Sequence, residues 1–544
     1  MKQTTKTLVS MGAFALLALA VAFAAAWVGR DEEQKAEKKE KSEKLFELDK
    51  TKARSIRLSK AGKLIAHVQR DDEKSPWKIL EPVKTDADEA TVNALLEKLS
   101  TMKQKGEVEG MDLKLAGVAD NEDWQKTGIE DSARISIRFD EEAKKMEGLL
   151  IGEENPFDHS VYVRRAGITD KTVRTIAKAD EAPFDKSLFD LRDKRVVHIE
   201  DSASISKLEV APEAAALHSG AANSAGSFAY AIDRDGTNWK LAKPVEALGD
   251  SATIDRLITS IKGLRATQVA AESSDAAALA QYGLSFPKVT VSLTVVPAGA
   301  KDSFVRKLLI GQPAPSAGSV TVHTYAKRDD SGTIYEIDNQ ILRDLSKELF
   351  DLRDKTVLKF DREAVRRIEF SEKGKETLSI ARHKDAPADG GFADETFEVL
   401  APKPGPAKKT KLSGNLYALA NIKAAAFTDE PFLHERAMLP AERTITLFGE
   451  KDEELARLAI FSETAGGTDK SKQRRQVQVL APGNPRFLEI DSASLNDFPR
   501  ALADVLDAPP PPTSAVNDAG TPMTPGAPQA PPAIGPKSPA HSSK

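Results

Sequence analysis

Short stretches in which apolar and polar residues alternate recur along the chain. They are Ser55–Leu58 and Leu64–Val68, then Ile205–Val210, and then Arg367–Phe370 with Thr377–Ile380. Because successive side chains of a strand point to opposite faces, this alternation predicts half-buried antiparallel strands. The same kind of stretch therefore opens three successive units of the chain.

One predicted strand in each unit ends at a proline. The three segments are Trp77–Pro82, Trp239–Pro244 and Phe397–Pro402, and each begins with an aromatic residue followed by a charged residue. Proline has no amide hydrogen with which to continue a ladder of hydrogen bonds, so we expect each strand to stop there. The threefold recurrence indicates that the units are copies of one module.

A helix is predicted after each of these strands. The residues at the spacing of one helical face are Val92, Leu95, Leu96, Leu99 and Met102, then Ile254, Leu257, Ile258, Ile261 and Leu264, and finally Leu412, Leu416, Leu419 and Ile422. Asp88 and Asp250 stand where an N-cap acceptor is expected. An apolar face of this kind usually packs on the protein's own sheet, and a partner helix is the alternative.

The second half of each unit alternates again. The segments expected to be strands are Arg134–Phe139, Leu149–Gly152 and Val161–Val163, and in the next unit Lys288–Leu293, Leu308–Gly311, Val322–Tyr325 and Thr333–Ile337. The predicted fold class is therefore α+β, with three tandem, largely antiparallel domains. In each of them one principal helix lies on one face of a sheet.

The boundaries follow from a repeated phrase. Leu188–Lys194 and Leu349–Lys355 both read Leu-Phe-Asp-Leu-Arg-Asp-Lys, and Leu502–Asp507 resembles them weakly. A repeat of this size is typical of duplicated domains rather than of a solenoid, and a length of 544 residues suits three to four domains. The predicted repeat domains are 45–195, 196–356 and a divergent 357–507.

The N-terminus is predicted to anchor the chain in a membrane. Lys2 and Lys6 precede an apolar, uncharged run from Leu8 to Val28, which as a helix spans roughly 30 Å, the thickness of a bilayer's hydrocarbon core. The lysines before the run place the N-terminus in the cytoplasm and the following domains outside. We therefore predict a transmembrane helix within 1–30. A cleaved signal peptide that ends near Ala24–Ala26 is the alternative.

Two further segments are expected to remain unpacked. Residues 31–44 are charged and carry no large apolar side chain, which predicts a solvated stalk. Residues 508–544 are rich in proline and predict a disordered tail, with recognition by a proline-binding partner as the alternative.

Composition excludes several kinds of chemistry. The chain has no cysteine, so disulfides, thiolate catalysis and thiolate metal sites are excluded. The net charge of −5 leaves no basic excess for binding nucleic acid. The sequence contains no phosphate-binding loop, dinucleotide fingerprint or nucleophile elbow, and we predict no cofactor.

The remaining candidates for chemistry have structural explanations. No two of the eight histidines stand at the spacing of a metal-ligand pair, and His67, His198 and His323 fall on expected strands. Asp233–Gly236 resembles the start of a calcium loop but lacks the later carboxylates, so we expect a hairpin turn.

The repeated phrase also contains charged residues that could do acid–base chemistry. Each of Asp190 and Asp193 has a basic neighbour, Arg192 or Lys194, which favours ionised salt links over a raised pKa. Because the third copy loses the basic residues, we interpret the phrase as a helix terminus that turns the chain. We predict no catalytic, cofactor-binding or metal-binding residue, and a protein that is not an enzyme.

The order of these motifs resembles a bacterial family, domain of unknown function 4340. The motifs are Trp77–Val83 and Trp239–Val245, the amphipathic helix, Tyr282–Leu284, Ile151–Gly152 and Ile310–Gly311, and Leu191–Lys194 and Leu352–Lys355. The resemblance is clear over 45–356 and weaker over 357–507, where Phe397 replaces the tryptophan. Similar members are membrane-anchored envelope proteins commonly encoded beside a gliding-motility-type ABC transporter and its auxiliary extracytoplasmic subunit. The resemblance supplies no catalytic residue.

We therefore expect a single-pass protein of the bacterial inner membrane with periplasmic domains. Its expected function is that of a non-enzymatic scaffold or accessory subunit, with an ABC transporter permease and its auxiliary subunit as partners. An extracytoplasmic hydrolase or polysaccharide-binding protein is the alternative, although aromatic residues make up only 6% of the chain. A third alternative is a stalk that holds the tail away from the membrane.

Overall fold

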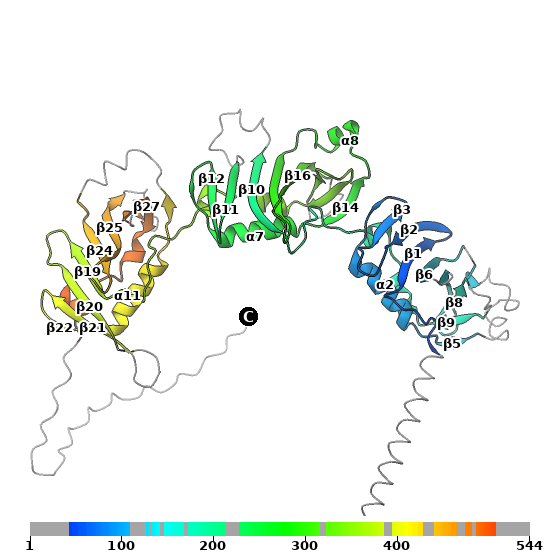
Figure 1. Cartoon of the computed structure of the whole chain (residues 1–544), viewed down its shortest axis with the longest axis horizontal. Coiled ribbons are helices and arrows are strands. Elements are labelled where there is room, and N and C mark those ends of the chain that lie inside the picture. Colours follow the sequence, from blue (N-terminus) through cyan, green and yellow to red (C-terminus); the bar gives the residue numbers. More distant parts are fainter. Residues whose placement is uncertain are drawn as a thin grey trace, which may run out of the picture. The chain divides into compact units, whose positions relative to one another are not determined.

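The computed structural model describes eleven segments of the chain. They are 43–108, 127–130, 132–141, 146–167, 172–212, 228–315, 322–385, 394–427, 440–464, 474–480 and 486–507. In this part of the chain, three sheets of nine strands each are formed (Figure 1). The predicted anchor, nearly all of the predicted stalk and the predicted tail lie outside the described segments. Within the described segments, no helix is both long and apolar enough to cross a membrane.

Every pair of neighbouring strands is antiparallel, and the order of strands is the same in all three sheets. The first sheet has the order β4-β3-β2-β1-β6-β7-β8-β9-β5, with β1 (Ala53–Lys60), β2 (Lys63–Gln69), β3 (Lys78–Glu81), β4 (Thr85–Asp86), β5 (Gly106–Glu107), β6 (Ile135–Glu141), β7 (Glu147–Glu154), β8 (Val161–Ala166) and β9 (Arg174–Ile176). The second has the order β13-β12-β11-β10-β15-β16-β17-β18-β14, with β10 (Ser204–Pro212), β11 (Tyr230–Asp235), β12 (Asn238–Lys243), β13 (Ala247–Leu248), β14 (Ala266–Ala271), β15 (Val289–Val296), β16 (Phe304–Pro313), β17 (His323–Arg328) and β18 (Ile334–Asp338). The third has the order β22-β21-β20-β19-β24-β25-β26-β27-β23, with β19 (Arg367–Glu372), β20 (Leu378–Asp385), β21 (Asp394–Ala401), β22 (Gly405–Pro406), β23 (Ala426–Phe427), β24 (Arg443–Phe448), β25 (Glu454–Thr464), β26 (Arg474–Leu480) and β27 (Arg486–Asp491).

We call the residues that build these sheets the first, second and third repeat. The predicted fold class, α+β with multiple antiparallel sheets, is confirmed. By the density of internal contacts the chain divides into two compact units that meet between Asp354 and Lys355. Because the first two sheets lie in the same unit, the predicted boundary at 195/196 stays a prediction.

Each sheet carries its principal helix on one face (Figure 1). The helices are α2 (Glu89–Thr101), α7 (Ser251–Lys262) and α11 (Lys409–Asn421). Each helix connects one edge strand of its sheet to the opposite edge, as α2 joins β4 to β5. The predicted apolar face is therefore buried against the sheet, with Val92, Leu95, Leu96 and Leu99 at its centre in α2.

The repeated aromatic residue has the same surroundings in all three sheets. Trp77 and Trp239 are each 1% exposed and Phe397 is 4% exposed, and each contributes to the core beneath its helix. The carbonyl groups of Trp77, Trp239 and Phe397 accept from the amides of Ala87, Gly249 and Ala407. The peptide bonds to Pro82, Pro244 and Pro402 that end these strands are all cis.

The predicted N-caps of the first two helices are confirmed. Asp88 accepts from the amide of Thr91 at 2.8 Å, and Asp250 accepts from the amide of Thr253 at 2.9 Å. In the third repeat the cap position is Lys408, whose side chain makes no cap hydrogen bond.

We expect Asp250→Ala to lower the free energy of unfolding of the first compact unit by about 1 kcal/mol, because the amide of Thr253 loses its acceptor. Urea denaturation followed by circular dichroism would measure the change. Asp250→Asn, which keeps an acceptor oxygen, is the matched control and should lie within about 0.5 kcal/mol of the wild type. Equal losses in both variants would contradict the capping role.

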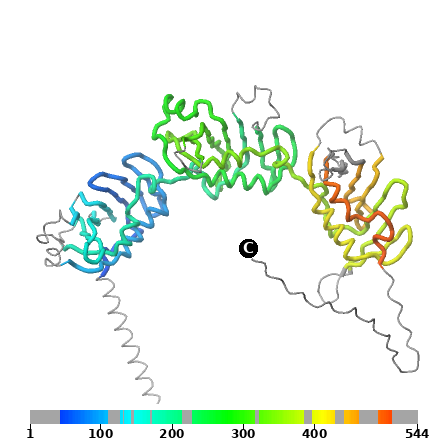
Figure 2. The backbone as a smooth tube through the Cα atoms, turned by 180° about the vertical axis from the view of Figure 1, so that it is seen from behind, coloured from blue at the N-terminus to red at the C-terminus, as the bar shows by residue number. Residues whose placement is uncertain are grey.

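A short closing segment completes each sheet. We give this name to residues 191–193, 352–354 and 505–507, which begin at the last residue of the helices α5 (Leu188–Leu191), α10 (Leu349–Leu352) and α13 (Leu502–Val505). The carbonyl groups of Leu191, Leu352 and Val505 accept from the amide of the N-cap residue of the principal helix, each at 2.8 Å. Figure 2 shows the orange trace of the third closing segment beside the yellow start of α11. The repeated phrase thus crosses the start of the principal helix and is hydrogen-bonded to it.

An opening segment precedes each sheet and pairs with the chain just beyond the principal helix. These segments are residues 43–45, 194–196 and 355–357. The carbonyl of Lys194 accepts from the amide of Ala266 at 2.7 Å, and the carbonyl of Lys355 accepts from Ala424 at 2.8 Å. Closing and opening segments are adjacent in sequence, so no linker residue separates Asp193 of the first repeat from Lys194 of the second.

The Tyr-Gly-Leu and Ile-Gly motifs pack against each other. Gly283 has φ +68°, in the left-handed region that favours glycine. A Cβ added at Gly311 would lie 2.3 Å from the carbonyl oxygen of Tyr282. In the first repeat a Cβ at Gly152 would lie 2.0 Å from the carbonyl oxygen of Thr127. Both motifs are therefore needed for a close backbone approach on the outer face of the sheet.

Shorter helices complete the described structure. They are η1 (Lys178–Asp180), η2 (Ala182–Phe184), α8 (Ala276–Gln281), α9 (Gln340–Leu345) and η4 (Ser492–Leu495). Leu279 of α8 packs against a small apolar cluster around Leu284 and Tyr325, on the face of the second sheet opposite α7. The sequence predicted that a helix covers only one face of each sheet, and it did not predict this cluster.

Candidate functional site

The first and second repeats, which share one compact unit, are joined by an ion pair. Arg192 lies in the first closing segment and is 3% exposed. Its Nη1 lies 3.1 Å from one carboxylate oxygen of Glu272, and its Nη2 lies 2.5 Å from the other. A fork-shaped guanidinium facing both oxygens of a carboxylate fixes orientation as well as distance. Glu272 follows β14 of the second repeat, so the pair links the two repeats.

A second cluster surrounds Asp193. Its carboxylate accepts from Arg195 Nε at 3.0 and 3.1 Å and lies 2.9 Å from Nδ1 of His198. Burial alone would raise the pKa of Asp193, but the hydrogen bonds from His198 and Arg195 outweigh burial and hold the pKa well below its usual range. Nε2 of His198 lies 4.0 Å from Asp86 of the first repeat. The cluster therefore keeps an ionised carboxylate at the junction.

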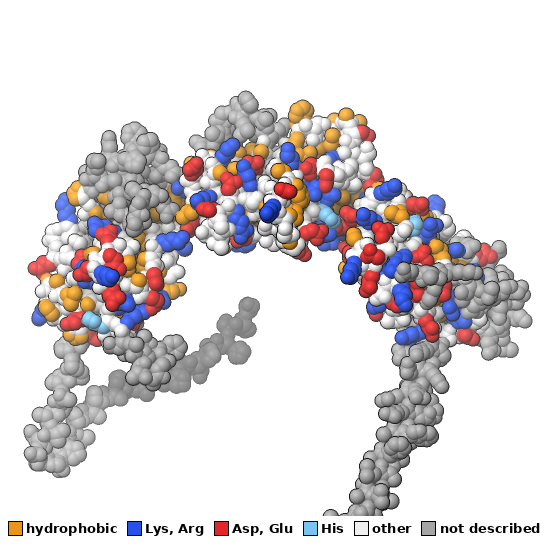
Figure 3. Space-filling model, in the orientation of Figure 1, with side chains coloured by type: hydrophobic (Ala, Val, Ile, Leu, Met, Phe, Trp, Pro, Cys, Tyr) orange, Lys and Arg blue, Asp and Glu red, His pale blue; other side chains and the backbone are white. Residues whose placement is uncertain are grey.

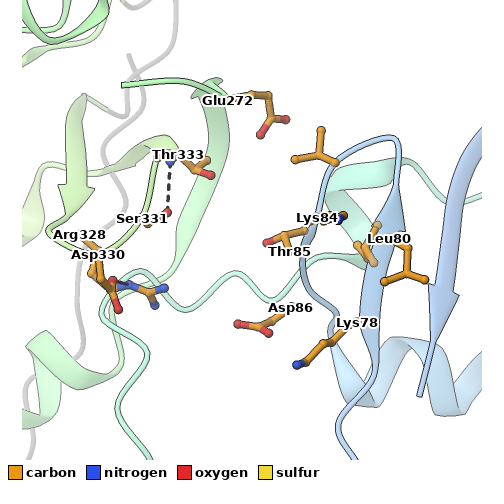
Figure 4. A pocket seen from close by; sticks show the side chains of 13 residues that line it. Lys78, Leu80, Lys84, Thr85, Asp86, Glu272, Arg328, Asp330, Ser331 and Thr333 are labelled. Atoms are coloured by element: carbon orange, nitrogen blue, oxygen red, sulfur yellow. Dashed lines mark hydrogen bonds and ion pairs between the residues drawn. The ribbon is translucent and has the colours of Figure 1, made fainter. Parts of the chain in front are cut away.

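A polar cleft of about 480 Å³ lies beside this junction. Figure 4 shows that side chains from β3 and β4 face side chains from the end of β14 and from the turn between β17 and β18. The charged residues that line it are Lys78, Lys84, Asp86, Glu272, Arg328 and Asp330. Cations and carboxylates are equal in number in this lining, so the cleft has no strong preference for one sign of charge.

The third repeat contains a second cavity, of about 360 Å³. Its floor includes Arg382, whose Nε and Nη2 donate to one oxygen of Glu395 at 2.9 and 2.5 Å. The hydroxyl of Ser413 in α11 donates to the other oxygen. Neither this cavity nor the cleft has an aromatic side chain among its described lining residues.

A buried serine–histidine contact occurs on the outer face of the first sheet. Oγ of Ser55 lies 3.2 Å from Nε2 of His67, and both residues are more than 90% buried. Asp140 is paired with Ser55 across β1 and β6 rather than placed behind His67, so it does not orient the imidazole as in a Ser-His-Asp triad. The contact is a buried polar pair within a sheet.

Burial lowers the pKa of His67, and the charge of Arg57 lowers it further, against the opposing effects of Glu81 and Asp140. The unfolded chain then takes up a proton more readily than the folded chain. We expect stability to fall as pH decreases below about 6.5, the ordinary histidine value, and to level off below the folded pKa. Urea denaturation of wild type and His67→Gln at several pH values would measure this.

In His67→Gln this part of the pH dependence should disappear. The matched control is His383→Gln, which removes an exposed histidine. An unchanged profile in His67→Gln would contradict the prediction. Burial raises the pKa of Asp140. This shift favours the folded state as the pH falls, which is opposite to the effect of His67, and it acts nearer to the pH range in which carboxyl groups ordinarily titrate.

The structure separates the candidates that the sequence singled out. Asp190 is the third residue of α5 and forms a capping box with the N-cap Ser187, whose hydroxyl and amide donate to its carboxylate and lower its pKa. Arg192 and Asp193 lie at the junction but bind different partners. The predicted salt links therefore exist, but they are not limited to residues that are neighbours in sequence. Lys194 Nζ donates to the carbonyl of Asp190 at 3.3 Å.

The other predicted candidates have ordinary structural positions. Asp233–Asp235 end β11 and Gly236 lies in the turn to β12, so the predicted hairpin is confirmed, with Asp235 paired to Asn238. His67 and His323 lie on strands, but the prediction for His198 is wrong. His198 has φ 49° and lies in the connection before β10, since its ring turns back to Asp193. Among the described residues, no group of histidine, aspartate and glutamate could hold a metal ion.

Comparison with protein families gives a match over much of the chain. The family model described as "Domain of unknown function (DUF4340)" matches residues 77–229 and 239–437, which is more than half of the chain. The chain belongs to the DUF4340 family. Both matched segments begin at the repeated tryptophan, Trp77 and Trp239. Comparison with curated proteins and with solved structures gave no match.

The DUF4340 motifs have structural roles in this chain. The tryptophan fills the core under the principal helix, Tyr-Gly-Leu and Ile-Gly permit a close backbone contact, and Leu-Arg-Asp-Lys forms the closing and opening segments. The sequence analysis did not identify Glu272, Arg382 or Glu395. Their partners are either distant in the chain or not part of any motif.

Proposed function

We propose that this DUF4340 protein is a non-enzymatic, membrane-anchored scaffold of the bacterial cell envelope. It acts as an accessory subunit of an ABC-type transport or gliding-motility-like complex, with its three repeats outside the inner membrane. The partners are the permease and its auxiliary extracytoplasmic subunit. The proposal combines the apolar N-terminal run with the three repeats that follow it.

The observation that carries the proposal is the direct joining of repeats. Asp193 donates its amide to Asp86 of the first repeat at 3.0 Å, and the next residue, Lys194, accepts from Ala266 of the second repeat. With the Arg192–Glu272 pair, this junction restrains the orientation of the first and second repeats. A scaffold needs such restraint, because partners bound to two modules then keep a defined spacing.

The charges at the repeated motifs also favour a structural role. The pKa values of Asp190 and Asp193 lie below the usual range because both carboxylates accept hydrogen bonds. A general acid would need a raised pKa. Both signs of charge are interspersed over the described face in Figure 3, as expected for a solvated surface that contacts proteins at restricted sites.

The polysaccharide-binding alternative is less well supported. Binding of sugars commonly uses aromatic side chains that are accessible to a ligand. Trp77 and Trp239 are buried in the cores of their repeats. The described lining residues of the cleft and of the third-repeat cavity include no aromatic side chain.

Capture from native membranes tests the scaffold proposal. The full chain with a C-terminal tag is expressed in its source bacterium, cross-linked, solubilised and purified, and co-purifying proteins are identified by mass spectrometry. We expect enrichment of an ABC permease or its auxiliary subunit over a tagged single-pass envelope protein of unrelated sequence. Recovery of neither partner above that control would overturn the proposal.

The identical phrases permit a precise deletion that separates a scaffold from a passive stalk. Removing residues 195–355 joins Lys194 to Thr356 and leaves one intact copy of the phrase. The variant retains the closing segment of the first repeat, and Lys194 takes the place of Lys355 in the opening segment of the third. We expect loss of at least one captured partner. An unchanged set of partners would favour the stalk.

A further inference from the structure

The polar link beside the cavity of the third repeat differs from that of the other two repeats. In the first two repeats the indole Nε1 donates to the principal helix, from Trp77 to Asn93 at 3.3 Å and from Trp239 to Asp255 at 2.8 Å. Phe397 has no such donor. The third repeat has Ser413 on α11, whose hydroxyl donates to Glu395 of β21. The polar link between strand and helix has therefore been remodelled.

A longer hairpin forms one wall of the cavity. In the second repeat Arg234 pairs with Trp239, and the hairpin closes one residue pair later. In the third repeat Arg382 pairs with Phe397, and the ladder continues through Lys384 opposite Glu395. The extra pairs place one cation and one carboxylate beside the first half of α11.

The floor of the cavity is a satisfied ion pair. The side chain of Arg382 is 4% exposed, and besides Glu395 it donates from Nη1 to the carbonyl of Arg362 at 2.6 Å. Burial alone would raise the pKa of Glu395, but the hydrogen bond from Ser413 and the Arg382 guanidinium lower it. Glu395 therefore stays ionised, and the floor is electrically neutral.

The mouth of the cavity carries the remaining charges. Lys384 forms an ion pair with Glu363, and Nε of Arg362 lies 3.8 Å from the other oxygen of Glu363. Lys384 is 21% exposed, whereas Glu363 is 59% exposed. The carboxylate is thus the outermost member of the group and can turn into solvent at little cost, which would leave two cations at the cavity.

We propose that this cavity binds a carboxylate group of a ligand, held by Lys384 and Arg362 in the place that Glu363 occupies. Counted with the floor, the lining has three cations and two carboxylates, so the cavity favours an anion. Glu363 competes with the ligand for the same cations. Because it is covalently attached beside them, its effective concentration is high, and this lowers the apparent affinity for the ligand. The inference does not depend on the scaffold proposal.

Two sources of the carboxylate are distinguished by two probes. Glutarate represents a free organic acid, and the blocked peptide acetyl-Gly-Glu-Gly-amide represents an acidic side chain of a partner. Binding to the full chain in detergent at low salt is measured by saturation-transfer-difference NMR. We expect Lys384→Gln to weaken binding of at least one probe by about tenfold, and Glu363→Gln to strengthen it severalfold.

Lys375→Gln is the matched control. Lys375 pairs with Glu372 at 2.8 Å on the same sheet, outside the cavity lining, so the variant loses the same charge and should bind as the wild type does. Thermal unfolding of each variant checks that the third repeat is folded. Binding of glutarate alone supports a small-acid ligand, and binding of the peptide supports a protein partner. Absence of binding by both probes, or equal affinities in Lys384→Gln and Lys375→Gln, would overturn the proposal.

Discussion

Replacing Trp239 with alanine is expected to lower the free energy of unfolding of the first compact unit by about 3–5 kcal/mol, the usual cost of removing a large aromatic side chain from a core. Trp239 is 1% exposed and packs among the strands and α7 of the second repeat. Its Nε1 donates to Asp255 at 2.8 Å, and the guanidinium of Arg234 lies 4.9 Å above the ring. Both contacts are lost with the indole.

Urea denaturation measured by far-UV circular dichroism would give the change, and hydrogen–deuterium exchange would show which sheet opens. Trp239→Phe is the matched control. Because Phe397 fills the corresponding place in the third repeat, we expect a loss of only about 1–2 kcal/mol, chiefly the hydrogen bond to Asp255. A loss below 1 kcal/mol in Trp239→Ala would show that the residue does not hold the core together.

The local elements were predictable from the sequence because they depend on neighbours in the chain. The period-two alternation of Ile205–Val210 corresponds to β10, and the helical spacing from Val92 to Leu99 corresponds to the buried face of α2. The caps at Asp88 and Asp250 follow from the preference of a helix start for a short acceptor side chain.

The arrangement of those elements was less predictable. The two-residue strand β5 has no periodicity to detect, yet it places the chain at the opposite edge of the sheet from β4. The hydrogen bond of Arg192 to Glu272 joins residues far apart in sequence, and the chain contains many other carboxylates that could have been the partner. His198 carried no local sign of its left-handed backbone, which depends on its contact with Asp193.

The divergence of the third repeat has a consistent physical interpretation. Lys408 stands at the N-cap, where an acceptor is absent, but its Nζ donates to the carbonyl of Ala503 at 3.2 Å in the closing helix. Leu506 replaces the arginine of the phrase and packs against the core of the third repeat. The backbone hydrogen bond between the closing segment and the helix start is thus kept, while the side chains of the segment change.

The family motif Ile-Gly leads to the second large effect, at Gly311. Its position allows no Cβ, because the added atom would lie 2.3 Å from the carbonyl oxygen of Tyr282 and 3.2 Å from that of Gly283. The obstructing atoms belong to the backbone, so a change of side-chain rotamer cannot relieve the clash. We expect Gly311→Ala to lower the free energy of unfolding of the first compact unit by about 3 kcal/mol.

The matched control is Gly414→Ala in the second compact unit. An added Cβ at Gly414 meets no atom within 4 Å, and the residue lies inside α11. Alanine restricts the unfolded chain and favours a helix, so this variant should be more stable by about 0.5–1 kcal/mol. Urea denaturation of both variants would therefore show changes of opposite sign in the two units. Tolerance of Gly311→Ala without loss of stability would mean that the loop carrying Tyr282 does not rest on β16, and the structural explanation of the Tyr-Gly-Leu and Ile-Gly motifs would fail with it.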